Sequence, residues 1–219
     1  VDDFETTVDA NPYTETEFES SPGNRPKKVA SPGHSWRMGS GHEVELDYTT
    51  NTTGEVKKYG VIHALSNNTY IPTLQLEGSY ESGQLYKTTT YDENHTGGTK
   101  NNTTEEFKNK RGLVVLRRTY ANMDLNGNGN QLDPGEIEVS HDTYYVYDKF
   151  QNLTYVIPPK AQGHVGLPDP VELAELCYQY IYDYRNRLVE KRIPGSDWER
   201  IVYNRWDQPI MTQNGHLKN

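Results

Sequence analysis

The sequence predicts an all-β protein made of consecutive antiparallel β-hairpins that form a curved ribbon or shell segment, with one short helix near residues 169–176. A turn-and-strand unit recurs with constant spacing, because Asn24-Arg25 precedes Trp36 by the same interval that separates Asn186-Arg187 from Trp198. The 17 tyrosines accompany only 33% hydrophobic residues, and tyrosine can bury its ring while its hydroxyl stays hydrated. The high content of Tyr, Thr, Val, Asn and Gly favours strands and turns over helices.

The recurring unit indicates a built surface, because units that cannot bury their own apolar face must stack on their neighbours. A tyrosine, usually followed by aspartate, ends one strand, and the fourth residue after the tyrosine must tolerate a positive φ angle. Asn186 and Asp207 suit this place, whereas Gln151 gains no local help there. The aspartate can accept backbone N–H bonds within the turn. The predicted structural turn residues are Tyr147, Asp148, Tyr182, Asp183, Asn186, Tyr203 and Asp207.

Residues 1–103 are expected to form a β-rich region before the regular repeats, with one degenerate repeat at 18–36. Alternating polar and apolar residues over 43–48 predict a half-buried strand. Residues 80–86 predict a tight hairpin with Gly83 at its bend. The remaining expected segments are a strand at 56–65, a turn at 66–68 and a loop at 92–102.

Residues 104–219 are expected to contain the regular repeats, with a polar loop insertion at 122–138 and a short helical insertion at 160–176. The sequence Asp169-Pro170-Val171-Glu172 fits a capping box with proline at the first helical position. A short helix is therefore predicted there, and strands and turns resume at Tyr178.

The composition bounds the partners and the compartment. The formal net charge of −9 argues against nucleic acid or an anionic membrane as partner, because both select clustered Lys and Arg. Cys177 is the single cysteine and is expected to be a buried small hydrophobic residue. The sequence has no run of 18 apolar residues. Neither end carries a boundary signal, so we expect a piece of a longer protein.

The segment from Asp124 to Glu136 is the best candidate for a ligand site. Oxygen-bearing side chains alternate along it, followed by glycine and a closing acid, as in an EF-hand-like calcium loop. The final glutamate falls one place late, because the loop has an extra residue, and a plain Asn/Gly-rich surface loop is the alternative. The candidate Ca²⁺ ligands are Asp124, Asn126, Asn128, Asn130, Asp133 and Glu136.

No constellation for catalysis stands out. Glu105 and Glu106 are adjacent, so on a strand they face opposite sides and cannot act as a general acid/base pair. A P-loop and a G-x-G-x-x-G motif are both missing from the sequence. Trp36 and Trp198 could stack on a sugar ring, although a tryptophan in this position more often closes a hairpin against its neighbour.

Several segments of the chain share one pattern: the phrases HDTYYVYD, NLTYVIPP, LCYQY and YDYRNRL and the segment 201–213. With these segments the chain resembles the RHS/YD-repeat family of secreted or surface proteins from Bacteroidetes-type bacteria. The resemblance is strong from about residue 104 onward and weaker before it. The chain departs from the family pattern at Gln151, where Gly is usual, at Asn204, where Asp is usual, and at Gln208, where Arg is usual.

The resemblance implies an all-β ribbon that spirals into a hollow shell, which commonly encloses a C-terminal effector such as a toxin. The chain would then be a non-enzymatic structural segment of that shell in a longer protein, secreted or at the bacterial cell surface. Its partner would be the remainder of its own parent chain, both shell and effector. The alternative is a cell-surface adhesin that binds polysaccharide or another cell through Trp36 and Trp198. A glycan-processing enzyme ranks last, and no membrane insertion is expected.

Overall fold

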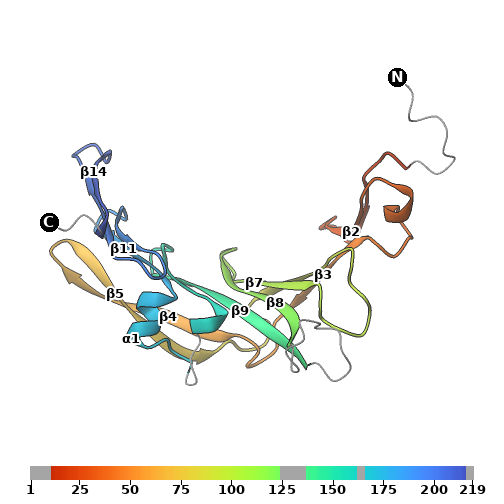
Figure 1. Ribbon diagram of the computed structural model, residues 1–219, viewed down its shortest axis with the longest axis horizontal. Helices are drawn as coiled ribbons and strands as arrows, with labels where there is room; N and C mark the ends of the chain where they lie inside the picture. The colour runs from red at the N-terminus through yellow and green to blue at the C-terminus, as the bar shows by residue number, and fades with distance from the viewer. Residues whose placement is uncertain (1–10, 124–136, 162–165, 216–219) are drawn as a thin grey trace. The chain divides into compact units, whose positions relative to one another are not determined.

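The computed structural model describes residues 11–123, 137–161 and 166–215. Within these ranges the chain is mainly antiparallel β-sheet with one α-helix (Figure 1). The strands are β1 (Glu15–Phe18), β2 (Pro26–Ala30), β3 (Val44–Thr50), β4 (Lys57–Ser66), β5 (Thr69–Ser79), β6 (Tyr86–Tyr91), β7 (Thr103–Lys108), β8 (Val114–Met123), β9 (Ile137–Tyr147), β10 (Leu153–Ile157), β11 (Tyr178–Asp183), β12 (Leu188–Arg192), β13 (Glu199–Tyr203) and β14 (Pro209–Gln213). The helices are α1 (Pro170–Glu175) and two 3₁₀ turns, η1 (His34–Trp36) and η2 (Pro159–Ala161).

The strands pair in the order β1-β2-β3-β6-β7-β8-β9-β10-β11-β12-β13-β14, while β4 pairs only with β5, and β5 also pairs with β11. Among the described strands this path has two ends and does not close on itself. This confirms the predicted all-β class built from antiparallel strands.

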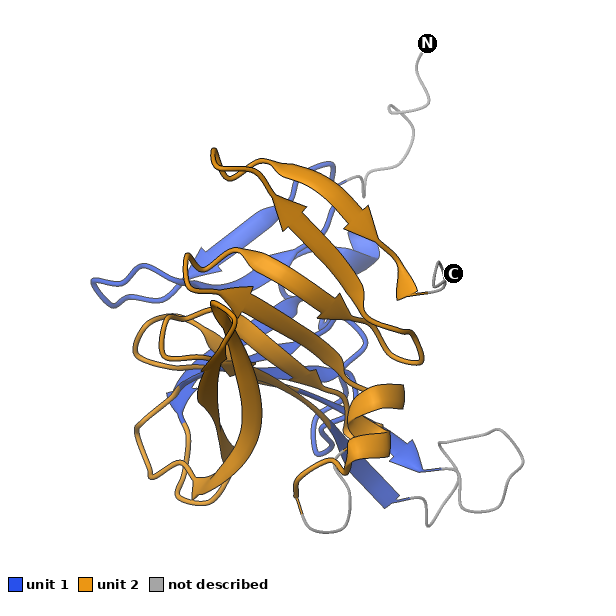
Figure 2. Cartoon of the chain, turned by 90° about the vertical axis from the view of Figure 1, so that its left-hand side faces the viewer, with its two compact units in different colours: residues 1–50, 86–107, 118–141 blue, residues 51–85, 108–117, 142–219 orange. Residues whose placement is uncertain are grey.

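The chain divides into two compact units that interleave along the sequence (Figure 2). Unit 1 contains residues 1–50, 86–107 and 118–141, and unit 2 contains residues 51–85, 108–117 and 142–219. Strands β7, β8 and β9 therefore belong in part to each unit. The predicted boundary near residue 103 concerns repeat content and stays a prediction.

Unit 1 is organised around the long pairing of β3 with β6, which runs from Glu45 opposite Tyr91 to Thr50 opposite Tyr86. Strands β1 and β2 add a hairpin to the other side of β3. Phe107 and Ala30 are fully buried in this unit. The predicted strand at 43–48 is thereby confirmed.

Unit 2 contains a hairpin that lies off the main path of the sheet. Strands β4 and β5 form nine cross-strand residue pairs. The chain turns between them at Asn67 and Asn68, whose φ angles are 49° and 63°. Two consecutive residues with positive φ are what a two-residue hairpin turn requires, and asparagine tolerates that conformation. The predicted strand and turn over 56–68 are confirmed.

The predicted hairpin at residues 80–86 is wrong. Gly83 does adopt a positive φ of 72°, but the flanking strands pair elsewhere, β5 with β4 and β11, and β6 with β3 and β7. The reason lies in Asn51, which is 1% exposed. The Asn51 side-chain Oδ1 accepts the backbone N–H of Leu85 at 2.8 Å, and the Asn51 backbone N–H donates to the Leu85 carbonyl at 3.2 Å. The segment from 51 to 85 is thus an insertion whose two ends are tied together.

The predicted helix is confirmed as α1. Asp169 accepts the N–H groups of Val171 and Glu172 at 2.7 and 2.8 Å, and the Glu172 carboxylate accepts the N–H of Asp169 at 2.9 Å. Pro170 occupies the first turn, where its missing N–H costs nothing. Cys177 is fully buried directly after the helix, and burial raises the pKa of its thiol to about 12, as expected for an inert hydrophobic residue.

Candidate functional site

Four turns of unit 2 share one five-residue geometry. In each, the Oδ1 of an Asp or Asn at position one accepts the N–H groups of positions three and five at 2.8–3.1 Å. The residue at position four has a φ angle between 59° and 81°. The position-one residues are Asn109, Asp148, Asp183 and Asn204, and the position-four residues are Gly112, Gln151, Asn186 and Asp207.

This geometry confirms the predicted turn conformation, including positive φ at Gln151. It also explains how Asn204 takes the position that aspartate holds in the turns at Asp148 and Asp183. The turn needs one acceptor oxygen at position one, and both carboxylate and amide side chains supply it.

Side chains connect the last three of these turns in sequence, which we call the turn ladder (residues 148–152, 183–187 and 204–208). Asn152, at position five, donates to Asp148 in its own turn at 3.0 Å and to Asn186 in the next turn at 3.3 Å. Arg187, at position five of the second turn, repeats this relation. It binds Asp183 of its own turn at 2.6 Å and Asp207 of the next at 2.7 Å. The position-five side chain therefore links each turn to its successor.

The tyrosines before the turns make a second link between neighbouring hairpins. The Tyr182 hydroxyl donates to the carbonyl of Leu153, and the Tyr203 hydroxyl donates to the carbonyl of Leu188, both at 2.9 Å. Each acceptor is the first strand residue after the preceding turn. Burial raises the pKa of Tyr182 to about 12, so this hydroxyl remains a donor at physiological pH.

Asp183 is a buried carboxylate of the ladder, with the whole residue 5% exposed. Burial by itself would raise its pKa, but the hydrogen bonds from the Arg187 side chain and from the backbone N–H groups of Arg187 and Arg185 lower that pKa below its usual value. Asp183 therefore stays charged, and the turn stays closed, at neutral pH.

The β4–β5 hairpin packs against the first turn of the ladder. The His63 Nε2 lies 3.9 Å from the Asp148 carboxylate, and both side chains are almost fully buried. The Tyr70 ring contacts the His63 and Phe150 rings at centroid distances of 5.7 and 5.3 Å. Burial lowers the pKa of His63, Asp148 opposes this effect and Lys149 adds to it.

A related turn occurs in unit 1, in the segment predicted as a degenerate repeat. Asn24 has a φ of 44°, and Arg25 binds the Glu19 carboxylate through Nε at 2.7 Å and Nη2 at 2.9 Å. The Arg25 hydrogen bond lowers the pKa of Glu19 to about 2. As with Asn186-Arg187, an asparagine with positive φ precedes an arginine that pairs with an acid earlier in the chain.

The two tryptophans proposed for glycan contact lie in different units. Trp36 is 37% exposed and its ring lies 5.0 Å from the His42 ring, whereas Trp198 is half-buried. Trp206, which the sequence reasoning did not single out, is more exposed at 66%, and the Arg205 guanidinium covers its ring at 4.1 Å.

Sequence reasoning also missed the environment of Glu105. This residue is 3% exposed, and its carboxylate binds Lys87 at 2.9 Å and the Tyr120 hydroxyl at 2.8 Å. Arg118 lies 3.8 Å away. Glu106 faces the other side of the strand, as predicted from the strand period. The cluster neutralises a buried carboxylate. Its cationic partners lie on other strands, so the sequence near Glu105 does not predict them.

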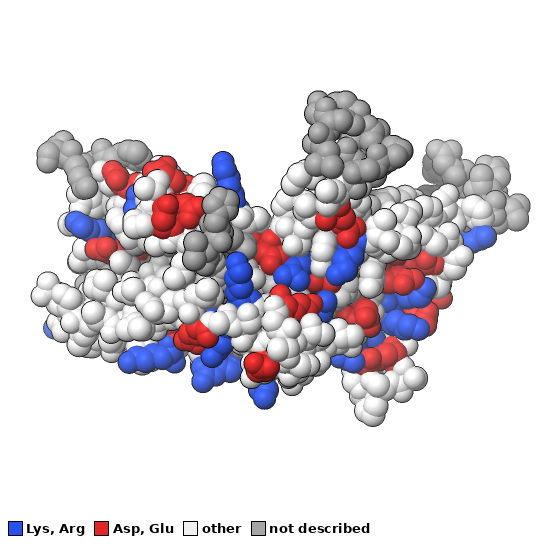
Figure 3. All heavy atoms as spheres, turned by 90° about the horizontal axis from the view of Figure 1, so that it is seen from below, with Lys and Arg blue, Asp and Glu red and all other residues white. Residues whose placement is uncertain are grey.

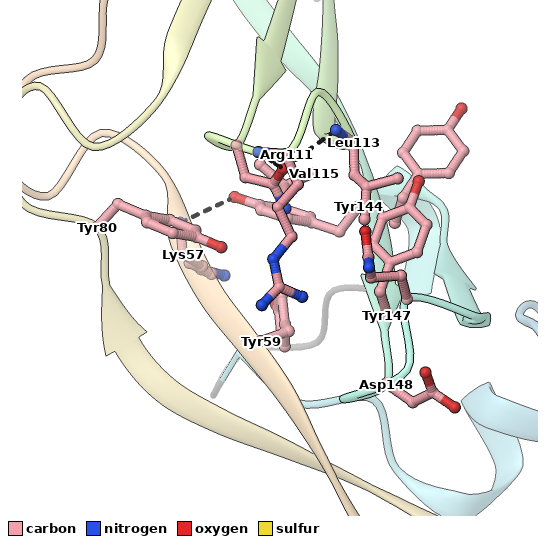
Figure 4. A pocket seen from close by; sticks show the side chains of 12 residues that line it. Lys57, Tyr59, Tyr80, Arg111, Leu113, Val115, Tyr144, Tyr147 and Asp148 are labelled. Carbon is pink, nitrogen blue, oxygen red and sulfur yellow. Dashed lines mark hydrogen bonds between the residues drawn. The ribbon is translucent and has the colours of Figure 1, made fainter.

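A pocket in unit 2 gathers aromatic and cationic side chains, and we call it the tyrosine pocket (Figure 4). Its volume is about 130 Å³. Figure 4 shows Arg111 in the middle of the lining residues, with Tyr80 and Lys57 on one side and Tyr147 on the other. Unit 1 has a larger, open concavity of about 540 Å³ that includes Lys28, Glu43 and His95. There, Glu43 accepts the N–H groups of Gly39 and Gly41.

The candidate calcium loop, Asp124 to Glu136, lies outside the described residues. Within the described ranges no three His, Cys, Asp or Glu side chains gather in a way that could hold a metal ion.

Figure 3 shows both signs of charge interspersed on the face that it presents. Of the helices that the structure describes, none has the length and apolar character needed to cross a membrane.

Comparison with known families finds one match. Residues 2–50 match the model of a family described as a domain of unknown function, DUF6443. No curated protein matches the chain. The match covers less than a quarter of the sequence and ends before the turn ladder, so the RHS/YD-repeat resemblance of the remainder stays a prediction, while similarity to DUF6443 holds for the N-terminal segment.

Proposed function

We propose that this chain is a non-enzymatic wall segment of an RHS/YD-repeat shell, and that the shell encloses or carries an effector of a longer secreted bacterial protein. The turn ladder carries this proposal. Its turns repeat one hydrogen-bonding pattern, and each turn is joined to the next by the same side-chain position. A wall needs this kind of neighbour-to-neighbour stabilisation, because each unit contacts mainly the units beside it.

The tyrosine links support the same function. A hydroxyl that reaches the carbonyl of the preceding hairpin holds successive hairpins in one register. The ring beneath it supplies buried apolar area in a protein whose mean hydropathy is −0.92. Stability is thus distributed along the repeats, as a wall requires, and the design needs no catalytic centre.

The test is protection of the effector in the parent protein. The wild-type parent and variants carrying Asp183→Ala or Asn204→Ala would be digested with a protease, and the survival of the region that follows the shell would be measured over time. We expect Asp183→Ala to shorten its survival several-fold, because the turn loses a buried acceptor, and Asn204→Ala to change it little. Equal protease sensitivity of the effector with and without the whole segment would contradict an enclosing role.

The adhesin alternative rests on the exposure of Trp36 and on the third tryptophan, Trp206. A glycan array probed with the chain and with the Trp36→Ala, Trp198→Ala and Trp206→Ala variants tests it. Binding that is lost in any of these variants would favour adhesion over a purely structural wall.

A further inference from the structure

The tyrosine pocket presents positive charge that the described protein does not neutralise. Neither the Lys57 ammonium nor the Arg111 guanidinium forms an ion pair with a carboxylate of the described residues. The one carboxylate in the lining, Asp148, is already engaged, because it accepts the N–H of Phe150 at 2.8 Å and two donors of Asn152 at 2.8 and 3.0 Å. In a chain with a net charge of −9, two cations in one concavity that lack an ion-pair partner among the described residues suit an anionic ligand.

Two tyrosines, Tyr59 and Tyr144, form the floor of the pocket and are held by contacts within the protein. The Tyr59 ring meets the Tyr144 ring edge-on with centroids 4.9 Å apart, and the Tyr59 hydroxyl donates to the Gly166 carbonyl at 2.6 Å. The Tyr144 hydroxyl donates to Asp142 at 3.4 Å and lies 3.5 Å from the Lys57 backbone N–H. These two tyrosines are therefore fixed by the protein itself and offer a preformed aromatic surface.

Tyr80 and Tyr147 differ from the tyrosines of the floor. Their hydroxyls make no hydrogen bond to a described residue, although both side chains line the pocket. Burial raises the pKa of each, so both hydroxyls remain protonated and can donate as well as accept. Two half-buried hydroxyls without hydrogen-bond partners among the described residues, beside an aromatic floor, suit a ligand that carries hydroxyl groups on a compact ring.

The volume sets the size of the ligand. A pocket of about 130 Å³ holds on the order of ten water molecules when each needs about 10–15 Å³ on this measure. That space accommodates one sugar ring and not an oligosaccharide. A sugar ring also presents a C–H face to aromatic side chains and hydroxyl groups at its edge.

We propose that the tyrosine pocket binds a sugar acid, that is, a single hexose ring bearing a carboxylate. Arg111 and Lys57 hold the carboxylate, because the guanidinium fork matches its two oxygens. The Tyr80 and Tyr147 hydroxyls bond to the ring hydroxyls. This ligand site is independent of the wall function, since it requires only that unit 2 is folded.

Titration of the 219-residue chain with D-glucuronate, followed by calorimetry and by NMR of the tyrosine signals, tests the proposal. D-glucose carries the ring without the charge, and acetate carries the charge without the ring. We expect glucuronate to bind at least about 10-fold more tightly than either, since a charge-assisted pair and ring contacts must act together.

Variants assign the site. Arg111→Gln should weaken glucuronate binding about 10-fold, while its backbone N–H keeps the bond to Asn109 that closes the turn. Lys110→Gln is the matched control, because Lys110 belongs to the same turn and does not line this pocket. Equal affinity for glucose and glucuronate, an unchanged affinity of Arg111→Gln, or no saturable binding of glucuronate would overturn the assignment. Protection of the effector in the parent protein reports on the wall and does not depend on this result.

Discussion

Replacing Asp183 tests whether the turn ladder stabilises unit 2 through buried acceptors. In Asp183→Ala, the N–H groups of Arg185 and Arg187 lose the oxygen that they share at 2.9 and 3.0 Å. A donor left unsatisfied in a buried site costs about 1–3 kcal/mol. The Asp183 site is 5% exposed, but water can reach the turn from outside, so the lower end applies to each donor. We expect unfolding to become easier by about 2 kcal/mol.

Asp183→Asn separates geometry from charge. The amide oxygen can keep both backbone bonds, as Asn204 does in its own turn at 2.9 and 3.0 Å, while the ion pair with Arg187 is lost. We expect less than half of the alanine effect. Because hydrogen bonding lowers the pKa of Asp183, the contribution of its charge is present above the unfolded pKa of about 3.9 and is lost as the pH falls through the lower folded value.

Asn204→Ala is the matched control, since it removes two bonds of the same geometry from an exposed turn. Its donors include the N–H of Trp206, a residue that is 66% exposed, so water replaces the lost acceptor. We expect a cost of about 0.5 kcal/mol. Urea unfolding followed by circular dichroism gives all three values. If Asp183→Ala cost no more than Asn204→Ala, burial of the turn would not be the source of its stability.

Other perturbations test further features. Gln151→Gly should raise the free energy of unfolding by up to about 1 kcal/mol in urea titrations, because glycine relieves the positive φ; a lower value would contradict this. Burial lowers the pKa of His63 below 6.5, so the stability that its neutral form contributes is present above that pH and is lost as the pH falls through the folded pKa. His63→Gln should flatten this fall in the thermal midpoint, and an identical profile would count against it. Asp169→Ala should cost about 1 kcal/mol in urea unfolding by removing the cap of α1, whereas no cost would show that the helix is held by packing alone. Added Ca²⁺ should raise the thermal midpoint if the loop from Asp124 to Glu136 binds it, and an identical midpoint with chelator would refute that site.

The features that sequence alone determined are those whose hydrogen bonds close over a few residues. The positive φ positions at Gln151, Asn186 and Asp207 and the cap at Asp169 follow from local side-chain chemistry, because the Asx oxygen and its N–H donors lie within four residues of each other. The strand at 43–48 follows from its period. Each of these elements is specified by side chains that lie within the element itself.

Tertiary structure decided which strands pair and which side chains meet. The strand period assigns each side chain to a face of the sheet but does not name the neighbouring strand. The sequence therefore could not show that β5 pairs with β11 and does not form a hairpin with β6 across residues 80–86. The tyrosine pocket unites Lys57 with Tyr144, 87 positions apart, and the ion pairs of Glu105 join three strands. Such contacts form only after chain closure over long loops, whose entropic cost and geometry depend on the whole fold, and no pattern of neighbouring residues encodes them.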